Sequence, residues 1–191
     1  MYAGRDETGE WESVLWLTSV WLCDNSEMSH LRFEVVTEKS RPLLENLWQL
    51  YFHDLSKFCG TRVGQDGKFD LRRLPLLFTS NDRIGYLFYK DSDLVGFSII
   101  RGFDQESRIA SEFFILGSFQ NQGLGKEIAL KLFRLHPGKW EISFQEANTP
   151  AVMFWRNVAE TVAPSTWIED KRPVPDKPEV PFDSWISFIS N

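Results

Sequence analysis

The sequence predicts a single α/β domain. Short runs rich in β-branched and aromatic residues alternate along the chain with longer segments in which apolar residues recur every three or four positions. These are the patterns of strands and of amphipathic helices. A chain of 191 residues with 42% hydrophobic and 15% aromatic content can also bury one sizeable core. No second folded domain is needed, and we expect the domain to span residues 28–191.

The expected strands share a β-rich composition and are bounded by turn residues. A hairpin connection at residues 90–93 joins the second strand to the third. The fourth strand begins near Ser111 and runs into a glutamine- and glycine-rich turn at Gln120. The other strands, in chain order, are expected at residues 31–36, 84–89, 94–100, 139–146, 166–169 and 184–189.

Three amphipathic helices are expected between these strands. The first covers residues 40–58, with Ser40 as its N-cap and Pro42 in its first turn. Pro75 argues against a continuous helix over residues 69–83, which remain ambiguous. The second and third helices are each marked by one apolar stripe, made of Leu124, Ile128, Leu132 and Leu135 in the second and of Ala151, Trp155, Val158 and Val162 in the third.

The most informative segment is the turn between the fourth strand and the second of these helices, Gln120-Asn121-Gln122-Gly123-Leu124-Gly125-Lys126. Glycine allows tight bending and a close approach of the backbone to a ligand. The first amides of a helix are unpaired and carry a partial positive charge, so the turn suits a pyrophosphate, and Lys126 adds a full charge. Neither the Walker pattern nor the dinucleotide pattern of glycines is present.

This Q-x-x-G-x-G turn resembles the acetyl-CoA loop of the Gcn5-related N-acetyltransferases. A second segment at the right distance, Asn148 to Trp155, resembles the family's N-x-x-A-x-x-F/L-Y segment. The resemblance extends loosely from about Leu31 to the C-terminus. It implies a mixed central sheet of about six to seven strands flanked by about four helices, with two central strands that part to admit the pantetheine arm of the cofactor.

The resemblance also implies the chemistry, which is transfer of acetyl from acetyl-CoA to a primary amine by direct attack in a ternary complex, without a metal. An alkyl amine with a pKa of about 10 must lose a proton before it attacks. Glu112 is the expected base, with Glu141 and Glu146 as weaker alternatives. A solvent-facing strand position is the competing interpretation of Glu112. The implied cofactor-binding residues are Phe113, Phe114, Ile115, Gln120, Asn121, Gln122, Gly123, Leu124, Gly125, Lys126, Asn148, Phe154 and Trp155.

Three of these residues also have structural interpretations. Asn148 is a favourable helix N-cap as well as an expected contact of the cofactor arm. Phe154 fits either the thioester channel or the core. Trp155 departs from the family pattern, which usually has tyrosine there as the acid for the departing thiolate, and an indole cannot supply that proton. This departure leaves open an alternative function, a catalytically weak acyl-CoA-binding sensor or interaction module on the same fold.

Charge and composition exclude several classes of partner. The net charge is −6, but residues 1–27 hold one basic and six acidic residues, so the remainder is nearly neutral, with 20 basic and 21 acidic residues. A basic patch for nucleic acid is therefore not expected. No apolar run reaches membrane-spanning length, and the two cysteines and three histidines lack metal-ligand spacing.

We accordingly expect a cytoplasmic protein that acts on a small-molecule or peptide amine, with no nucleic-acid or membrane partner. A homodimer through the last strand, residues 184–189, is possible. The segment 1–27 holds three of the eight tryptophans in no clear register and ends just before Met28. We interpret it as an N-terminal extension that need not be native, and a packed N-terminal arm is the alternative.

Overall fold

The computed structural model describes residues 31–174 and 181–191, and the expectation for segment 1–27 lies outside these residues. Within them the chain forms one α/β domain with a seven-stranded sheet in the order β1-β2-β3-β4-β5-β7-β6. The strands are β1 (Leu31–Val35), β2 (Arg83–Lys90), β3 (Asp93–Arg101), β4 (Ser107–Ile115), β5 (Gly138–Phe144), β6 (Ile168–Arg172) and β7 (Asp183–Ser190). The helices are α1 (Arg41–Cys59), α2 (Leu76–Thr79), α3 (Leu124–Leu135) and α4 (Thr149–Val162).

The sheet is mixed, as expected. All neighbouring strands are antiparallel except β4 and β5, which are parallel. The seven strands and four helices that the resemblance implied are confirmed. Two strand starts are wrong. β4 begins at Ser107 rather than near Ser111, because Ser107 and Arg108 already pair with β5. β6 begins at Ile168 rather than near residue 166, because the chain is still turning there, with Ser165 at φ 60° and Thr166 N–H bonded to the Ala163 carbonyl.

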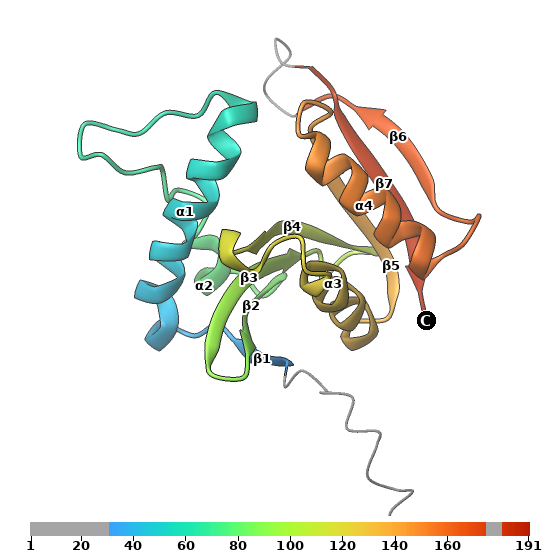
Figure 1. Ribbon diagram of the computed structural model, residues 1–191, viewed down its shortest axis with the longest axis horizontal. Coiled ribbons are helices and arrows are strands. Elements are labelled where there is room, and N and C mark those ends of the chain that lie inside the picture. The colour runs from blue at the N-terminus through green and yellow to red at the C-terminus, as the bar shows by residue number, and fades with distance from the viewer. Residues whose placement is uncertain (1–30, 175–180) are drawn as a thin grey trace, which may run out of the picture. The chain divides into compact units, whose positions relative to one another are not determined.

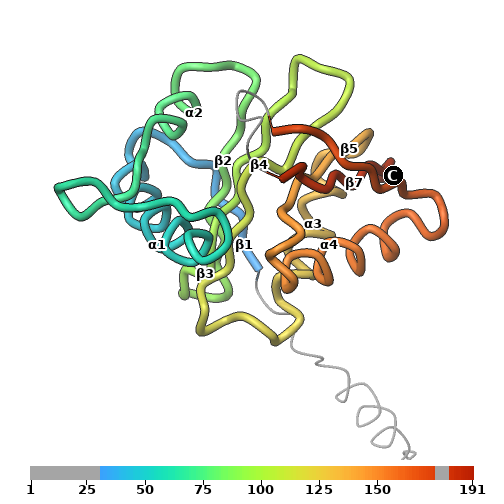
Figure 2. The backbone as a smooth tube through the Cα atoms, turned by 90° about the horizontal axis from the view of Figure 1, so that it is seen from above, coloured from blue at the N-terminus to red at the C-terminus, as the bar shows by residue number. Residues whose placement is uncertain are grey.

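Helices cover both faces of the sheet, and each face has its own apolar core (Figures 1 and 2). The helices α1 and α2 lie on one face, where Leu44, Leu47 and Trp48 of α1 pack against strand residues that include Phe97 and Phe114. The helices α3 and α4 lie on the other face. The stripe of α3 is buried except at its end, because Leu135 is the last residue of the helix and is 51% exposed. β4 therefore runs between two helical layers.

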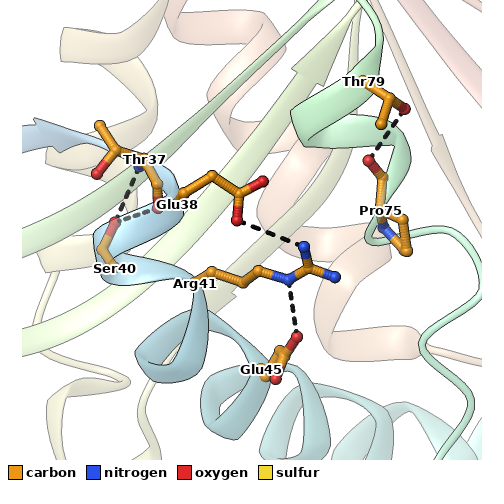
Figure 3. A network of polar contacts seen from close by, with 7 residues as sticks. All are labelled: Thr37, Glu38, Ser40, Arg41, Glu45, Pro75 and Thr79. Carbon is orange, nitrogen blue, oxygen red and sulfur yellow. Dashed lines mark hydrogen bonds and ion pairs between the residues drawn. The ribbon is translucent and has the colours of Figure 1, made fainter.

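Polar contacts brace the start of α1, and a separate one lies within α2 (Figure 3). The expected N-cap Ser40 makes no cap bond to α1. Its hydroxyl accepts from the Thr37 N–H at 2.9 Å and donates to the Thr37 carbonyl at 3.1 Å. Arg41 pairs with Glu45 at 3.0 Å and lies 5.0 Å from the ring of Phe78 in α2. The start of α1 thus contacts α2 through Arg41, while Trp48, which stacks on Phe97 of β3, packs α1 against the sheet.

Candidate active site

The strands β4 and β5 part halfway along their length. Their ladder joins only Ser107–Ala110 to Lys139–Ile142, although β4 continues to Ile115 and β5 to Phe144. Ser111, the next residue of β4, has no partner in β3 either, because the register shifts there by one residue. Such a bulge bends the strand and increases its twist. The parting of the two strands, which only the resemblance implied, is thus present. It begins at a bulge that the sequence pattern did not reveal.

A cavity of about 460 Å³ opens at this parting. Its walls come from α1, the end of β4, the glycine turn and the start of α4. Eleven of the thirteen residues expected to bind a cofactor line it, namely Phe113, Phe114, Ile115, Gln120, Asn121, Gly123, Gly125, Lys126, Asn148, Phe154 and Trp155. The other two do not: Leu124, the first residue of α3, is buried in the core, and the Gln122 amide donates to the Ser118 carbonyl at 2.9 Å.

The glycine turn has the geometry of an anion cradle. Gly123 caps α3 with φ 79°, in the left-handed region that favours glycine, and Asn121 has φ 59°. A Cβ at Gly123 would meet nothing within 4 Å. A Cβ at Gly125 would lie 3.4 Å from Phe154 Cε2. The first amides of α3 and the Lys126 side chain are therefore placed at the cavity where a pyrophosphate would fit.

The Gln120 side chain connects the glycine turn to the end of β4. Its Nε2 donates a hydrogen bond of 2.7 Å to the main-chain carbonyl of Ile115 at the end of β4. Ile115 follows the last residues of β4 that pair with β5. The bond therefore gives this carbonyl a partner where β5 has moved away, and it ties the turn to the strand.

Aromatic rings form the wall between the cradle and the parted strands. Phe113 stacks on Phe154 at a centroid distance of 5.7 Å and meets Trp155 edge-on at 5.1 Å. Trp155 is 7% exposed, so it belongs to the core as well as to the cavity wall. Asn148 caps α4 by accepting from the Ala151 N–H at 3.3 Å, and it also lines the cavity. Asn148 is thus a helix N-cap, and both Asn148 and Phe154 lie in the cavity wall, where their contact with a cofactor stays a prediction.

Glu112 does not occupy a solvent-facing position, because it is 7% exposed. Within residues 31–174 and 181–191 its carboxyl group forms no hydrogen bond or ion pair, and it does not line the cavity. Burial raises the pKa of this carboxyl to about 7, while the positive charges of Arg73, Arg83 and Arg101 act in the opposite direction. A carboxyl group with this pKa is suited to exchanging protons near neutral pH.

Two arginines, Arg101 of β3 and Arg83 of β2, follow Glu112 across the sheet. Glu112 lies opposite Ile99 in the ladder of β3, and Arg101 follows two residues later on the same face. Arg101 in turn lies opposite Arg83 of β2, whose Nε is 3.3 Å from an oxygen of Asp82. Burial, together with the charges of Arg83 and Arg73, lowers the pKa of Arg101.

The two weaker candidate bases lie elsewhere and are engaged in other contacts. Glu141 accepts from Arg172 at 3.2 Å. Glu146 accepts from the Ser184 hydroxyl at 2.6 Å, and this bond and the nearby Lys171 lower the pKa of its carboxyl. Neither residue lines the cavity. Neither carboxylate is therefore placed to take a proton from an amine in the cavity.

Sequence reasoning missed the contribution of α1 to the cavity. Tyr51, Asp54, Leu55, Lys57 and Phe58 line it from that helix. Tyr51 belongs to the apolar pattern that predicted the helix, and it was therefore interpreted only as core. The helical spacing of Tyr51, Leu55 and Phe58 could have shown that they share a face, but not which surface that face meets.

Comparisons with solved structures give a consistent answer for the fold. An acetyltransferase from Thermus thermophilus matches with a TM-score of 0.62 at 21% identity, covering 83% of this chain and 96% of that one. Spermidine N-acetyltransferase from Vibrio cholerae, solved with CoA and spermine, matches with a TM-score of 0.61 at 11% identity, covering 85% and 96%. The Escherichia coli ribosomal-protein-S18-alanine N-acetyltransferase matches with a TM-score of 0.56 at 8% identity, covering 84% and 94%.

No protein-family model and no curated protein sequence matches the chain. Among the described residues no group of three or more histidine, cysteine or acidic side chains is arranged to hold a metal ion. No helix in the same part of the chain is long and apolar enough to cross a membrane.

Proposed function

We propose that this chain, which has the fold of the Gcn5-related N-acetyltransferases, transfers an acetyl group from acetyl-CoA to a primary amine by direct attack in a ternary complex. One observation carries the proposal: the end of β4, beyond its last pair with β5, and the glycine turn at the head of α3 line a single cavity. The turn supplies amides and Lys126 for a pyrophosphate. The parting supplies unpaired strand edges for a pantetheine arm.

Residues of β4 provide the chemistry in this proposal. Acetyl-CoA supplies a thioester whose carbonyl carbon is attacked by the amine. Glu112, with its pKa raised by burial to about 7, takes up the amine proton. Main-chain N–H groups of β4 near Ile115, beyond the last β5 partner, are the candidate donors to the oxyanion.

Trp155 supports a second candidate, a sensor or interaction module that binds acyl-CoA but transfers it weakly. Its indole stands in the cavity wall where a tyrosine hydroxyl would protonate the leaving thiolate. A thiol with a pKa of about 8.5 leaves tolerably as the anion, so the absence of this acid slows transfer without abolishing it. We therefore prefer the acetyltransferase as the function, and the acyl-CoA-binding module is the second candidate.

The test is calorimetric titration of the protein with acetyl-CoA, alongside Gly123→Glu. A glutamate there places bulk and negative charge at the cradle. Gly67→Glu is the matched control, because Gly67 also has a left-handed φ, of 74°, and open space around its Cβ, and it does not line the cavity. We expect wild type and Gly67→Glu to bind alike and Gly123→Glu to lose binding.

An amine screen then separates the two candidate functions. Spermidine and a peptide with N-terminal alanine are the first acceptors to try, since the structural neighbours are named for such amines. Binding of acetyl-CoA with turnover of an amine supports the enzyme. Binding without turnover of any amine supports the module, and no binding by the folded wild-type protein overturns both.

A further inference from the structure

The proposed base is separated from the proposed reaction site. Glu112 is 7% exposed and is not among the residues that line the cavity. An acceptor amine in the cavity therefore cannot reach its carboxyl group directly. Some group between them has to carry the proton if Glu112 is to receive it.

Tyr51 is a residue of the cavity wall that also contacts the strand residues next to Glu112. It lines the cavity from α1. Its ring meets Phe114 at a centroid distance of 5.9 Å and Phe97 at 5.8 Å, both edge-on. Phe114 lies two residues after Glu112 on β4, and Phe97 lies two residues before Ile99, the ladder partner of Glu112. All four side chains share the α1 face of the sheet, so Tyr51 covers the patch next to Glu112.

Electrostatics supports this placement. Burial, and next to it the negative charge of Glu112, raise the pKa of the Tyr51 phenol. The two groups are therefore close enough to influence each other. A phenol with a raised pKa stays protonated at neutral pH, and its hydroxyl can donate one hydrogen bond while it accepts another.

We propose that the Tyr51 hydroxyl relays the proton of the acceptor amine from the cavity to the buried Glu112 carboxylate. This inference rests on the proposed acetyl transfer. The amine reacts in its neutral form, its ammonium proton having passed to solvent. As its nitrogen bonds to the thioester carbonyl carbon and the C–S bond breaks, one of its remaining protons passes to Tyr51 Oη. The phenolic proton passes to Glu112, which requires the two side chains to move into hydrogen-bond contact, and the thiolate departs with the electron pair. Tyr51 thus ends neutral, and Glu112 ends protonated.

The carboxylate that does line the cavity is less suited to this role. Asp54 is ion-paired with Lys57 at 3.3 Å, and its side chain is 45% exposed. Its carboxylate is thus engaged with a cation on the same helix. The route through Tyr51 instead leads to a carboxyl group whose pKa is near neutrality.

The first test is Tyr51→Phe, which removes the hydroxyl and keeps the ring contacts. We expect kcat for the amine found in the screen to fall by about 10²-fold, the lower range for loss of acid–base catalysis. Calorimetric affinity for acetyl-CoA and the melting temperature should stay unchanged. Tyr89→Phe is the control, because Tyr89 packs at the edge of the same core and does not line the cavity.

A double-mutant cycle with Glu112→Gln distinguishes a relay from two independent roles. In a relay the two groups act in one path, so Tyr51→Phe should cost little more in a Glu112→Gln background. The inference is overturned if the two losses multiply, or if Tyr51→Phe keeps the wild-type kcat. Absence of turnover in the wild type would instead refute the proposed transferase, so the two failures are distinguishable.

Discussion

Gly96 of β3 lies so close to Phe114 of β4 that a Cβ on Gly96 would stand 2.0 Å from the Phe114 carbonyl oxygen. The contact is between backbones, so a side-chain rotation cannot relieve it. It occurs next to the last ladder pair of these strands, Gly96 with Ile115. Glycine at this position therefore allows β4 to keep its path beside β3 where it has left β5.

Replacing Gly96 by alanine should displace the end of β4. We expect a loss of more than about 3 kcal/mol in the free energy of unfolding, since the backbone has to shift. Gly117→Ala is the control, because a Cβ there meets nothing within 4 Å. Urea unfolding of both variants measures the difference, and equal stabilities would show that β3 and β4 move apart at little cost.

The buried Glu112 should make stability depend on pH. Its pKa is about 7 in the folded protein against the usual 4.5 of a glutamate, so between these values the folded state keeps a proton that the unfolded state releases. Stability contributed by this group is therefore lost as pH rises from 4.5 to 7, by up to about 3 kcal/mol. From pH 4 to pH 8, the free energy of unfolding of the wild type should fall more than that of Glu112→Gln. Parallel pH profiles of the two proteins would contradict the prediction.

Activity should increase as pH rises, whereas the stability contributed by Glu112 decreases. Glu112 accepts a proton only when it is ionised, so kcat/KM should rise with pH through about 7. Deprotonation of the amine near pH 10 adds a second rise that every variant shares. Glu112→Gln should lose the first rise and keep the second, and a step at pH 7 that survives the substitution would assign it to another group.

Restoring a phenol at residue 155 should speed departure of the thiolate. Trp155→Tyr places a hydroxyl in the cavity wall, and we expect kcat to rise on the order of tenfold where this departure limits the rate. Trp155→Phe controls for the smaller ring, which also loses part of the contact with Phe113. Equal rates for the two variants, measured at saturating acetyl-CoA, would show that the leaving group needs no acid.

The hydrogen bond between Gln120 and Ile115 should contribute to cofactor affinity. Gln120→Leu leaves the Ile115 carbonyl without this partner, at a cost of about 1 kcal/mol, which corresponds to roughly a fivefold weaker Kd for acetyl-CoA. Gln122→Leu is the matched control, since that amide bonds to Ser118 outside the cavity. Calorimetry of the two variants checks the result, and equal affinities would limit Gln120 to a structural role.

Much of this arrangement could be predicted from the sequence because the signals are local. Gly123 requires a left-handed turn and stands directly before an amphipathic helix, so both the cradle and α3 could be located. The four-residue helix α2 was not predicted, because Pro75 was interpreted as a break rather than as its N-cap. Such short helices carry too few residues to show a period.

The parts that the sequence did not reveal depend on packing between distant segments. Alternation along β4 shows which side chains share a face, but only the position of α1 over that face buries Glu112. The bulge at Ser111 depends on pairing with β3, and nothing in the sequence of β4 alone marks it. The meeting of Tyr51 with Phe114 joins residues more than sixty positions apart.

The short ladder between β4 and β5 should also open more easily than the longer ladder between β5 and β7. Only four residue pairs join the β1–β4 half to the β5–β7–β6 half, whereas seven pairs join β5 to β7. Amide protons in the last part of β4 that lack β5 partners should exchange with deuterium faster than those of β5. A ligand that fills the gap would slow that exchange. The half-lives of these few amides would then report occupancy of the cavity even in a protein with no measurable turnover.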